Sequence, residues 1–285
     1  MMVFIKQGFK DYMNISLLSL SVADTIALLS QLWTCFYMKV LVQDALSHWL
    51  AVIYLASSWP HVISIRVISF LVVFITLERY LCISLPLKIK SIVTHRRTIV
   101  IIGFVYFFTI STAIPIYFAC YTGPVFDYDT NNTIVVILYT EDGVAMESVT
   151  LMFGVTVQLT SFIMVVILTI ALVQKFVQTT KWRLSTSSAT RQDHVTKRDK
   201  SAVKMIILIS TIYIVCYTPL FLMTIAMVCV KDFSATGRYR NFFVMMTSAA
   251  FTADSINSAI SILVYFKMST KFRQTFFTIF YFLTS

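Results

Sequence analysis

The stretch FITLERYLCISLPLKIK, residues 74–90, places two adjacent charged residues, Glu78 and Arg79, in an otherwise almost wholly apolar run. Pro86 and two lysines follow the run. A charge inside lipid costs free energy, whereas a charge at the wet end of a helix is tolerated. The stretch therefore predicts that a membrane-spanning helix ends here, next to a basic loop.

Composition supports a membrane protein. The 285 residues are 58% hydrophobic and 13% charged, and the mean hydropathy is +0.81. A soluble domain of this size could not bury so much apolar surface, but a bilayer can cover it. The net charge of +10 is compatible with nucleic acid or with an anionic membrane surface. The long uncharged runs leave no room for a soluble basic domain, so we expect lipid contact and no nucleic-acid partner.

Six segments are long and apolar enough to cross a bilayer, which takes about 20 residues. They are residues 13–38, 59–83, 98–120, 148–173, 205–230 and 242–266. After them, Phe272, Phe276 and Phe280 recur at helical spacing, which is typical of a helix lying in the membrane interface. The predicted fold is an all-α transmembrane bundle, residues 1–285, with an interfacial helix at about 269–283.

Charge bias between the loops predicts the orientation. Most of the 23 lysines and arginines fall in one alternate set of loops, which the positive-inside rule assigns to the cytoplasm. We therefore expect a multi-pass plasma-membrane protein with a cytoplasmic C-terminus. Asn131 begins the sequence Asn-Asn-Thr, a glycosylation acceptor on the predicted outer face.

Four stretches, in order, carry a resemblance to a known family. LERYLCISLPL at 77–87 resembles the Glu/Asp-Arg-Tyr signature of rhodopsin-like (class A) G-protein-coupled receptors, with Pro86 at the family spacing. SLSVAD at 19–24, YIVCYTPL at 213–220 and NSAISILVY at 257–265 resemble the second, sixth and seventh helices of that family. The resemblance implies an extracellular small-molecule or peptide ligand, a heterotrimeric G-protein partner, and no cofactor or metal.

The resemblance also implies roles for particular residues. In it, Arg79 at the cytosolic end of a helix is held by acidic partners and released on activation. The implied activation switch consists of Glu78, Arg79, Asp199, Tyr213, Tyr217, Pro219 and Tyr265. The implied buried polar network consists of Asp24, Asn257, Ser258 and Ser261. The implied G-protein contacts are Arg79, Leu87 and Lys204.

The sequence departs from the family pattern at several points. Six spans are predicted instead of seven, because the match begins at the first inner loop, so we expect an N-terminally truncated receptor. Tyr54 stands where the family has the cysteine of its outer disulfide, and loop 121–147 contains no cysteine. Several stretches are most similar to invertebrate, molluscan-type chemosensory and orphan neuropeptide-like receptors.

Three residues are candidate ligand contacts in the outer half of the bundle. His61 occupies the position at which amine receptors of the family carry an aspartate, which argues against a biogenic amine. Arg66 and Asp254 lie within predicted spans, where ionisable residues are functional candidates by default. Three interpretations stay open for them: a pair with which a ligand competes, an anion site at Arg66, or a structural pair.

Two other functions compete with signalling. A secondary transporter would use intramembrane charges such as Asp24, Arg66 and Asp254, although no internal repeat is visible. A non-signalling receptor fragment is the second alternative. An enzyme is not expected, because none of the four histidines has a clustered acid, nucleophile or metal partner in the sequence.

Overall fold

The computed structural model describes most of the chain. The described residues are 2–7, 12–41, 54–127, 132–186, 193–230, 233 and 238–284. Side chains are not described at some of these positions, among them 183–186 and 193–200. Two predictions therefore concern residues outside the described part: the glycosylation acceptor Asn131, and Asp199 of the activation switch, whose side chain is not described.

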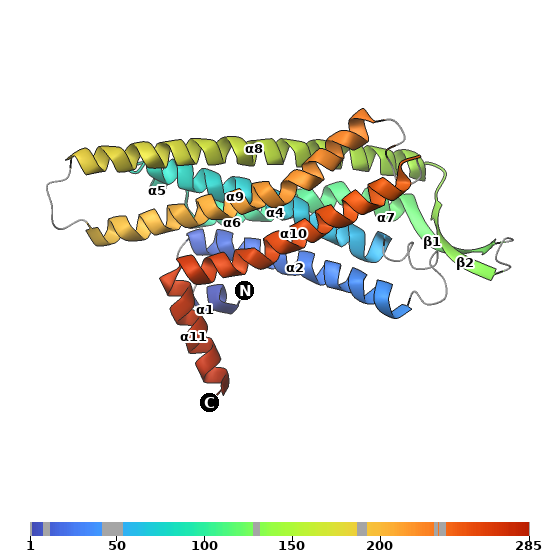
Figure 1. Ribbon diagram of the computed structural model, residues 1–285, viewed down its shortest axis with the longest axis horizontal. Coiled ribbons are helices and arrows are strands. Elements are labelled where there is room, and N and C mark those ends of the chain that lie inside the picture. Colours follow the sequence, from blue (N-terminus) through green and yellow to red (C-terminus); the bar gives the residue numbers. More distant parts are fainter. Residues whose placement is uncertain are drawn as a thin grey trace.

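Helices account for most of the described chain, and the membrane-spanning ones run roughly along one long axis (Figure 1). Their bounds are α1 Met2–Gln7, α2 Tyr12–Leu41, the π-helix η1 Tyr54–Ser58, α4 Trp59–Ser84, α5 Ile89–Ile92, α6 His95–Ala113, α7 Pro115–Ala119, α8 Gly143–Thr186, α9 Asp193–Cys229, α10 Arg240–Met268 and α11 Thr270–Thr284.

Six helical segments of the described residues are long and apolar enough to span a membrane. They are Met13–Phe36, Tyr54–Ser84, His95–Ala119, Gly143–Trp182, Ser201–Cys229 and Asn241–Met268. The predicted fold class, a six-span helical bundle, is confirmed. The helices α8 and α9 extend well past the predicted spans into polar sequence at one end of the bundle, because a helix does not need to end where the apolar run ends.

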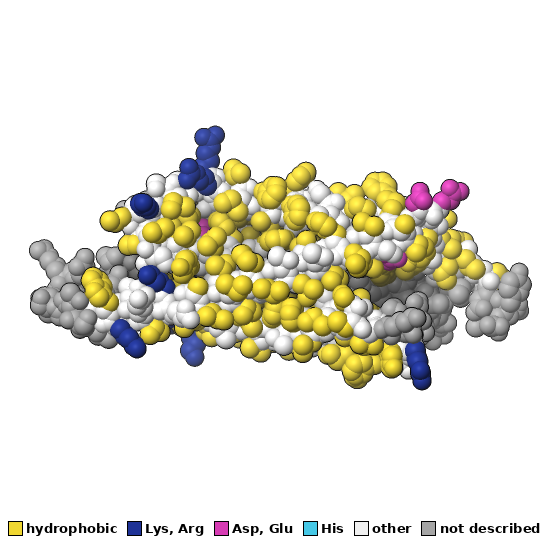
Figure 2. Space-filling view, turned by 90° about the horizontal axis from the view of Figure 1, so that it is seen from above, with side chains coloured by type: hydrophobic (Ala, Val, Ile, Leu, Met, Phe, Trp, Pro, Cys, Tyr) yellow, Lys and Arg dark blue, Asp and Glu magenta, His cyan; other side chains and the backbone are white. Residues whose placement is uncertain are grey.

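α4 is the central helix of the bundle and packs against α2, α6, α8 and α9. The largest fully buried apolar side chains come from α2, α4, α7, α8, α9 and α10, and include Leu20, Ile68, Leu71, Ile116, Leu172, Ile206, Tyr213, Tyr217 and Tyr265. Large apolar side chains also cover the outside, as Figure 2 shows along the length of the bundle. An apolar exterior around a packed core is the arrangement expected in lipid.

The two ends of the bundle differ in charge and in structure. At one end, which we call the basic end, lie the exposed residues Lys88, Arg96 and Arg97 around α5. In Figure 2 most of the visible Lys and Arg side chains gather toward this end, while acidic side chains appear at the other. The asymmetry matches the loop charge bias that predicts a cytoplasmic basic end.

The opposite end, the hairpin end, carries a β-structure that the sequence analysis did not predict. Strands β1, Cys120–Asp127, and β2, Asn132–Tyr139, pair antiparallel and project from the bundle (Figure 1). The third predicted span ran to Cys120, but Pro115 separates the short helix α7 from α6 and the chain is extended from Cys120 onward. Proline cannot donate the backbone hydrogen bond that a continuous helix needs there.

α11 turns sharply away from α10 and lies beside the N-terminal helix α1 at the basic end (Figure 1). Aromatic contacts join them: the ring of Phe4 lies 5.3 Å from Tyr265 and 5.1 Å from Phe272, between ring centroids. The Asn14 amide donates to the Phe4 carbonyl at 2.9 Å. These contacts hold an amphipathic helix across the end of the bundle, as predicted for an interfacial helix.

Candidate functional site

Arg79 lies near the basic end of α4, five residues before the helix ends at Ser84. Its side chain is only 8% exposed, and Nε and Nη2 have no hydrogen-bond partner among the described residues. The neighbouring carboxylate, on Glu78, accepts a hydrogen bond from the Ser16 hydroxyl of α2 at 3.2 Å. Glu78 therefore links α4 to α2 beside a buried guanidinium.

Hydrogen bonds between side chains join α4 to α9 above Arg79. The hydroxyls of Thr76 and Ser210 lie 2.8 Å apart. Further toward the hairpin end, the Tyr213 hydroxyl donates to Ser69 Oγ at 2.7 Å. Gln158 of α8 donates to the same Ser69 oxygen at 3.2 Å. Movement of α9 away from α4 would break the first two of these bonds.

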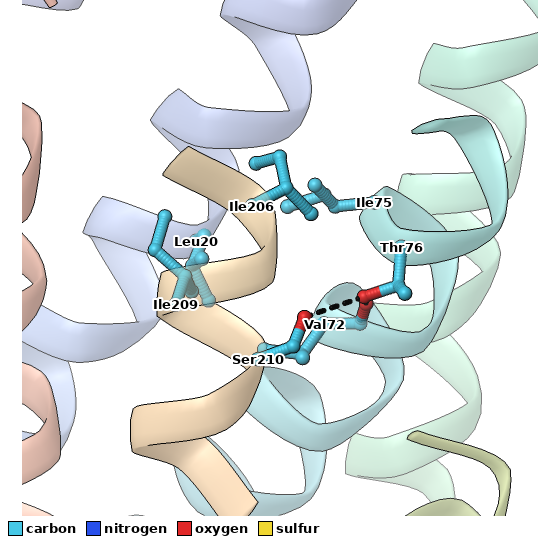
Figure 3. Close-up of a pocket in the computed structure, with 7 residues that line it drawn as sticks. All are labelled: Leu20, Val72, Ile75, Thr76, Ile206, Ile209 and Ser210. Atoms are coloured by element: carbon cyan, nitrogen blue, oxygen red, sulfur yellow. Dashed lines mark hydrogen bonds between the residues drawn. The ribbon is translucent and has the colours of Figure 1, made fainter. Parts of the chain in front are cut away.

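A narrow gap lies beside the bond between Thr76 and Ser210 (Figure 3). Its lining comes from α2, α4 and α9 and consists of Leu20, Val72, Ile75, Thr76, Ile206, Ile209 and Ser210. The gap has no room for a water molecule, so it is a small packing defect and not a binding pocket. It lies where α2, α4 and α9 meet, and the hydrogen bond between Thr76 and Ser210 joins α4 to α9 at this point.

Pro219 lies inside α9, ten residues before the helix ends at Cys229. α9 changes direction along its length (Figure 1), which is the expected result of a proline that removes a backbone hydrogen bond. Near this bend the rings of Tyr213 and Tyr217 stack with centroids 4.1 Å apart. The Tyr217 hydroxyl reaches the Ile65 carbonyl of α4 at 3.4 Å.

Polar residues of α2 and α10 meet in the middle of the bundle. Asp24 is 3% exposed, and Ser258 approaches its carboxylate without meeting hydrogen-bond geometry. Asn257 and Ser261 are buried on the same helix as Ser258, and the Ser261 hydroxyl donates to the Asn257 carbonyl at 3.0 Å. The structure thus brings Asp24 and Ser258 together, while Ser261 is satisfied within its own helix.

Arg66 lies deep in the half of the bundle toward the hairpin end. It is 6% exposed, and Nη1 has no partner within the described part of the chain. The guanidinium carbon lies 6.0 Å from the centre of the Trp59 ring, a cation–π distance. The guanidinium also lies against Gly154 of α8, in the space that a Cβ atom would fill. Gly154 is therefore what makes room for the charge.

His61 and Asp254 face the interior from opposite helices. His61 Nδ1 lies 3.1 Å from the Ala27 carbonyl of α2, and its ring packs edge-on against Phe251 of α10 at 4.8 Å. His61 Nε2 has no partner among the described residues. Asp254, one helical turn beyond Phe251, is 3% exposed, and neither carboxylate oxygen has a described partner.

The ion pair that the sequence suggested between Arg66 and Asp254 is not formed. Arg66 Nη1 and both Asp254 oxygens are without hydrogen-bond partners in the described residues, so the two side chains do not satisfy each other. Arg66 turns toward α8, whereas Asp254 is close enough to Cys216 and Tyr217 of α9 to interact with them electrostatically. The two hypotheses that depend on this pair, one structural and one competitive, lose their geometric basis.

Comparison with known protein families identifies this arrangement. A sequence model described as "7 transmembrane receptor (rhodopsin family)" matches residues 1–260. The chain belongs to the rhodopsin family of seven-transmembrane receptors. A comparison with curated proteins finds no match. The family is one of receptors, so the protein is a multi-pass membrane receptor.

In this receptor the remaining predicted contact residues lie at the basic end. Leu87, on the short segment between α4 and α5, is 95% exposed. Lys204 is exposed on α9. Tyr265 is 1% exposed and packs against Phe4 and Phe272. These positions are compatible with the predicted roles, which remain predictions.

The hairpin end of the receptor has a contact that the sequence analysis missed. Tyr54 donates a hydrogen bond to the Glu147 carboxylate of α8, at the position where the resemblance places the cysteine of an outer disulfide. All five cysteines are free thiols. The pKa of the Tyr139 phenol is raised, first by burial and then by its interaction with Glu147. Glu147 therefore connects η1, α8 and β2 without a covalent link.

Ser69, Thr76, Ser210 and Gly154 were also missed. Hydroxyl residues within apolar runs are common, and in a helix they can bond the preceding turn, as Ser69 and Thr76 do with Ile65 and Val72. A usable signal did exist, because Ser69 and Thr76 are seven residues apart and so share one face of α4. No signal in a single sequence indicates that Gly154 faces Arg66.

Proposed function

We propose that this receptor converts the binding of an extracellular chemical or peptide ligand into activation of a heterotrimeric G protein. In this proposal the basic end, including the C-terminus, faces the cytoplasm, and the hairpin end faces outward. The chemical ligand is favoured by the likeness of several stretches to molluscan-type chemosensory receptors. Arg79, Leu87 and Lys204 form the surface that meets the G protein.

The burial of Arg79 at the basic end carries this proposal. A guanidinium that is 8% exposed and has two nitrogens without partners in the described part of the chain costs free energy in this arrangement, which favours a second arrangement that exposes it. Outward movement of α9 would uncover it, since α9 is joined to α4 one turn away by the bond between Thr76 and Ser210. Pro219 supplies the bend about which the basic half of α9 moves.

Nucleotide exchange on purified G proteins tests the proposal without knowledge of the ligand. The full chain is reconstituted in lipid vesicles with each G-protein subtype, and basal exchange is measured. We expect the rate of receptor-dependent exchange to be about tenfold lower, or lower still, in the Arg79→Gln variant, because the variant loses a charged hydrogen bond to the G protein. The matched control is Arg238→Gln, an exposed arginine at the hairpin end. Equal exchange by the Arg79→Gln variant and the unaltered receptor would contradict the proposal.

A further inference from the structure

Two buried ionisable residues, one basic and one acidic, lie in the outward half of the bundle, and they are not partners of each other. Arg66 is 6% exposed and Asp254 is 3% exposed. Nη1 of the arginine and both oxygens of the aspartate have no partner among the described residues. Buried charges are normally paired, because an unpaired charge loses its hydration without gaining a partner. Two such groups in one region require an explanation beyond packing.

The two charges lie at similar depth. His61 and Phe251 are in contact, at 4.8 Å between ring centres, and so mark a common level on α4 and α10. Arg66 is five residues beyond His61 and Asp254 is three residues beyond Phe251, which corresponds to about 7.5 Å and about 4.5 Å of helix rise. Both residues are therefore within about one and a half turns of the same contact.

Tyr217 of α9 is close to the surroundings of both residues. Its hydroxyl reaches the carbonyl of Ile65, the residue before Arg66, at 3.4 Å. Its phenol is close enough to Asp254 to interact with it electrostatically. The Arg66 guanidinium lies against Gly154 of α8. The two ionisable side chains therefore have different neighbours, and Tyr217 is near both sets.

We propose that Arg66 and Asp254 recognise a small zwitterion, with the ligand's carboxylate on Arg66 and its ammonium group on Asp254. This deepens the proposed receptor function and rests on it. A guanidinium binds carboxylates with two parallel hydrogen bonds, and an aspartate pairs with an ammonium. The ligand class is free amino acids, including those with the amine at the far end of the chain, and dipeptides. A ligand of one charge would leave one of the two buried groups unpaired.

Gly154 gives the site an adjustable part. The atoms that would meet a Cβ at Gly154 are the end atoms of the Arg66 side chain. An arginine end moves easily, so an incoming carboxylate can draw the guanidinium from its place against α8. The Trp59 ring, whose centre is 6.0 Å from the guanidinium carbon in this structure, provides an aromatic wall on the side toward the hairpin end.

Thermal unfolding of the purified full chain tests the assignment without any G protein. The probes are α-amino acids, ω-amino acids with two to six carbons, and dipeptides. Each is compared with its N-acetyl form, which lacks the ammonium, and its amide, which lacks the carboxylate. At a hundredfold excess over Kd we expect at least one free zwitterion to raise the unfolding midpoint by about 5 to 10 °C. Both capped forms should lose this shift. A panel with no active zwitterion, or with equally active capped forms, overturns the proposal.

Variants then identify the two contact residues. For the active zwitterion we expect Arg66→Gln and Asp254→Asn each to weaken binding about 10- to 100-fold. The matched controls are Arg273→Gln and Glu141→Gln, at exposed positions, which should leave binding unchanged. Unchanged binding in either buried variant overturns the assignment of that residue and with it the zwitterion.

The two proposals fail in different ways. Ligand-induced stabilisation by a zwitterion, combined with absent nucleotide exchange, would contradict the G-protein proposal and support the ligand assignment. Nucleotide exchange that depends on Arg79, combined with no stabilisation by any zwitterion of the panel, would support the G-protein proposal and contradict the ligand assignment.

Discussion

Arg66 and Arg79 are two buried arginines on one helix, and their surroundings differ. Thirteen residues separate them, about 20 Å along the axis of an α-helix. Arg79 follows an acidic residue and lies five residues from the end of α4, close to the basic loop. Arg66 lies far from either end of the 54–84 span, beside Trp59 and Gly154, with no acid bound to it among the described residues.

The difference indicates two kinds of stored free energy. The charge of Arg79 can reach water when α9 moves, so its burial is reversed by a change of the receptor's own shape. The charge of Arg66 is far from both ends of the span and 6% exposed, so a ligand or a rearranged side chain is needed to satisfy it. In this interpretation the exposure of Arg79 depends on the conformation of the basic end. The pairing of Arg66 depends on a ligand that enters from the hairpin end.

Among the predicted effects on stability, the largest should come from removing the charge of Arg66, and removing the charge of Arg79 should have a much smaller effect. We expect Arg66→Met to raise the free energy of unfolding by about 2 to 3 kcal/mol, the penalty for an arginine at the bilayer centre. Arg79→Met should change it by less than about 1 kcal/mol, because its helix end is near water. The measurement is unfolding of the purified chain in mixed micelles with added denaturing detergent. Destabilisation by Arg66→Met would mean that the arginine is structural, and the contrast would be lost.

The Tyr54 contact with Glu147 tests what holds the helices around Arg66. The Tyr54→Phe variant removes the donor and leaves a half-buried carboxylate without it, so we expect a loss of about 1 to 2 kcal/mol in the free energy of unfolding. Tyr121→Phe, at an exposed position of β1, is the matched control and should change nothing. The same detergent titration measures both. Identical unfolding curves for Tyr54→Phe and the unaltered receptor would show that the hydrogen bond between Tyr54 and Glu147 does not stabilise the hairpin end.

The bond between Thr76 and Ser210 tests the conformational half of the comparison. Ser210→Ala removes one hydrogen-bond partner between α4 and α9 next to a loosely packed gap. We expect the closed arrangement to lose about 1 kcal/mol, so basal nucleotide exchange should rise about fivefold. Ser248→Ala, in which an exposed serine bonds only its own helix, is the control. A fall in exchange after Ser210→Ala would mean that the bond belongs to the active arrangement.

The fold was largely predictable, and the inter-helix chemistry was not. Apolar runs of about 20 residues fix the number of spans, and charge bias between loops separates the two ends. Four motif stretches led to the rhodopsin family, which the match over residues 1–260 bears out. The hairpin at Cys120–Tyr139 escaped because its first strand continues an apolar run.

The contacts of Arg66 could not be predicted, for a physical reason. Hydropathy shows which residues face lipid or core, but it does not show the angle at which one helix faces another. The sequence suggested a partner of opposite charge, Asp254, whereas the guanidinium is accommodated by a missing side chain at Gly154. An absent Cβ has no hydrophobic or electrostatic signature in a single sequence.

Substitution of Gly154 should have the smallest effect on stability. It should nevertheless affect the function proposed for Arg66 and leave the function proposed for Arg79 unchanged. Gly→Ala within a helix normally stabilises by about 1 kcal/mol, and Gly103→Ala, with open space around its Cβ, should show this gain. At Gly154 the new methyl group must displace the Arg66 guanidinium, so we expect the gain to shrink by about half because the displaced end is flexible. Zwitterion binding should weaken in Gly154→Ala, while Gly103→Ala binds normally and both retain the Arg79-dependent basal exchange. Equal stabilisation and equal binding in the two alanine variants would show that the charge does not depend on the space at Gly154.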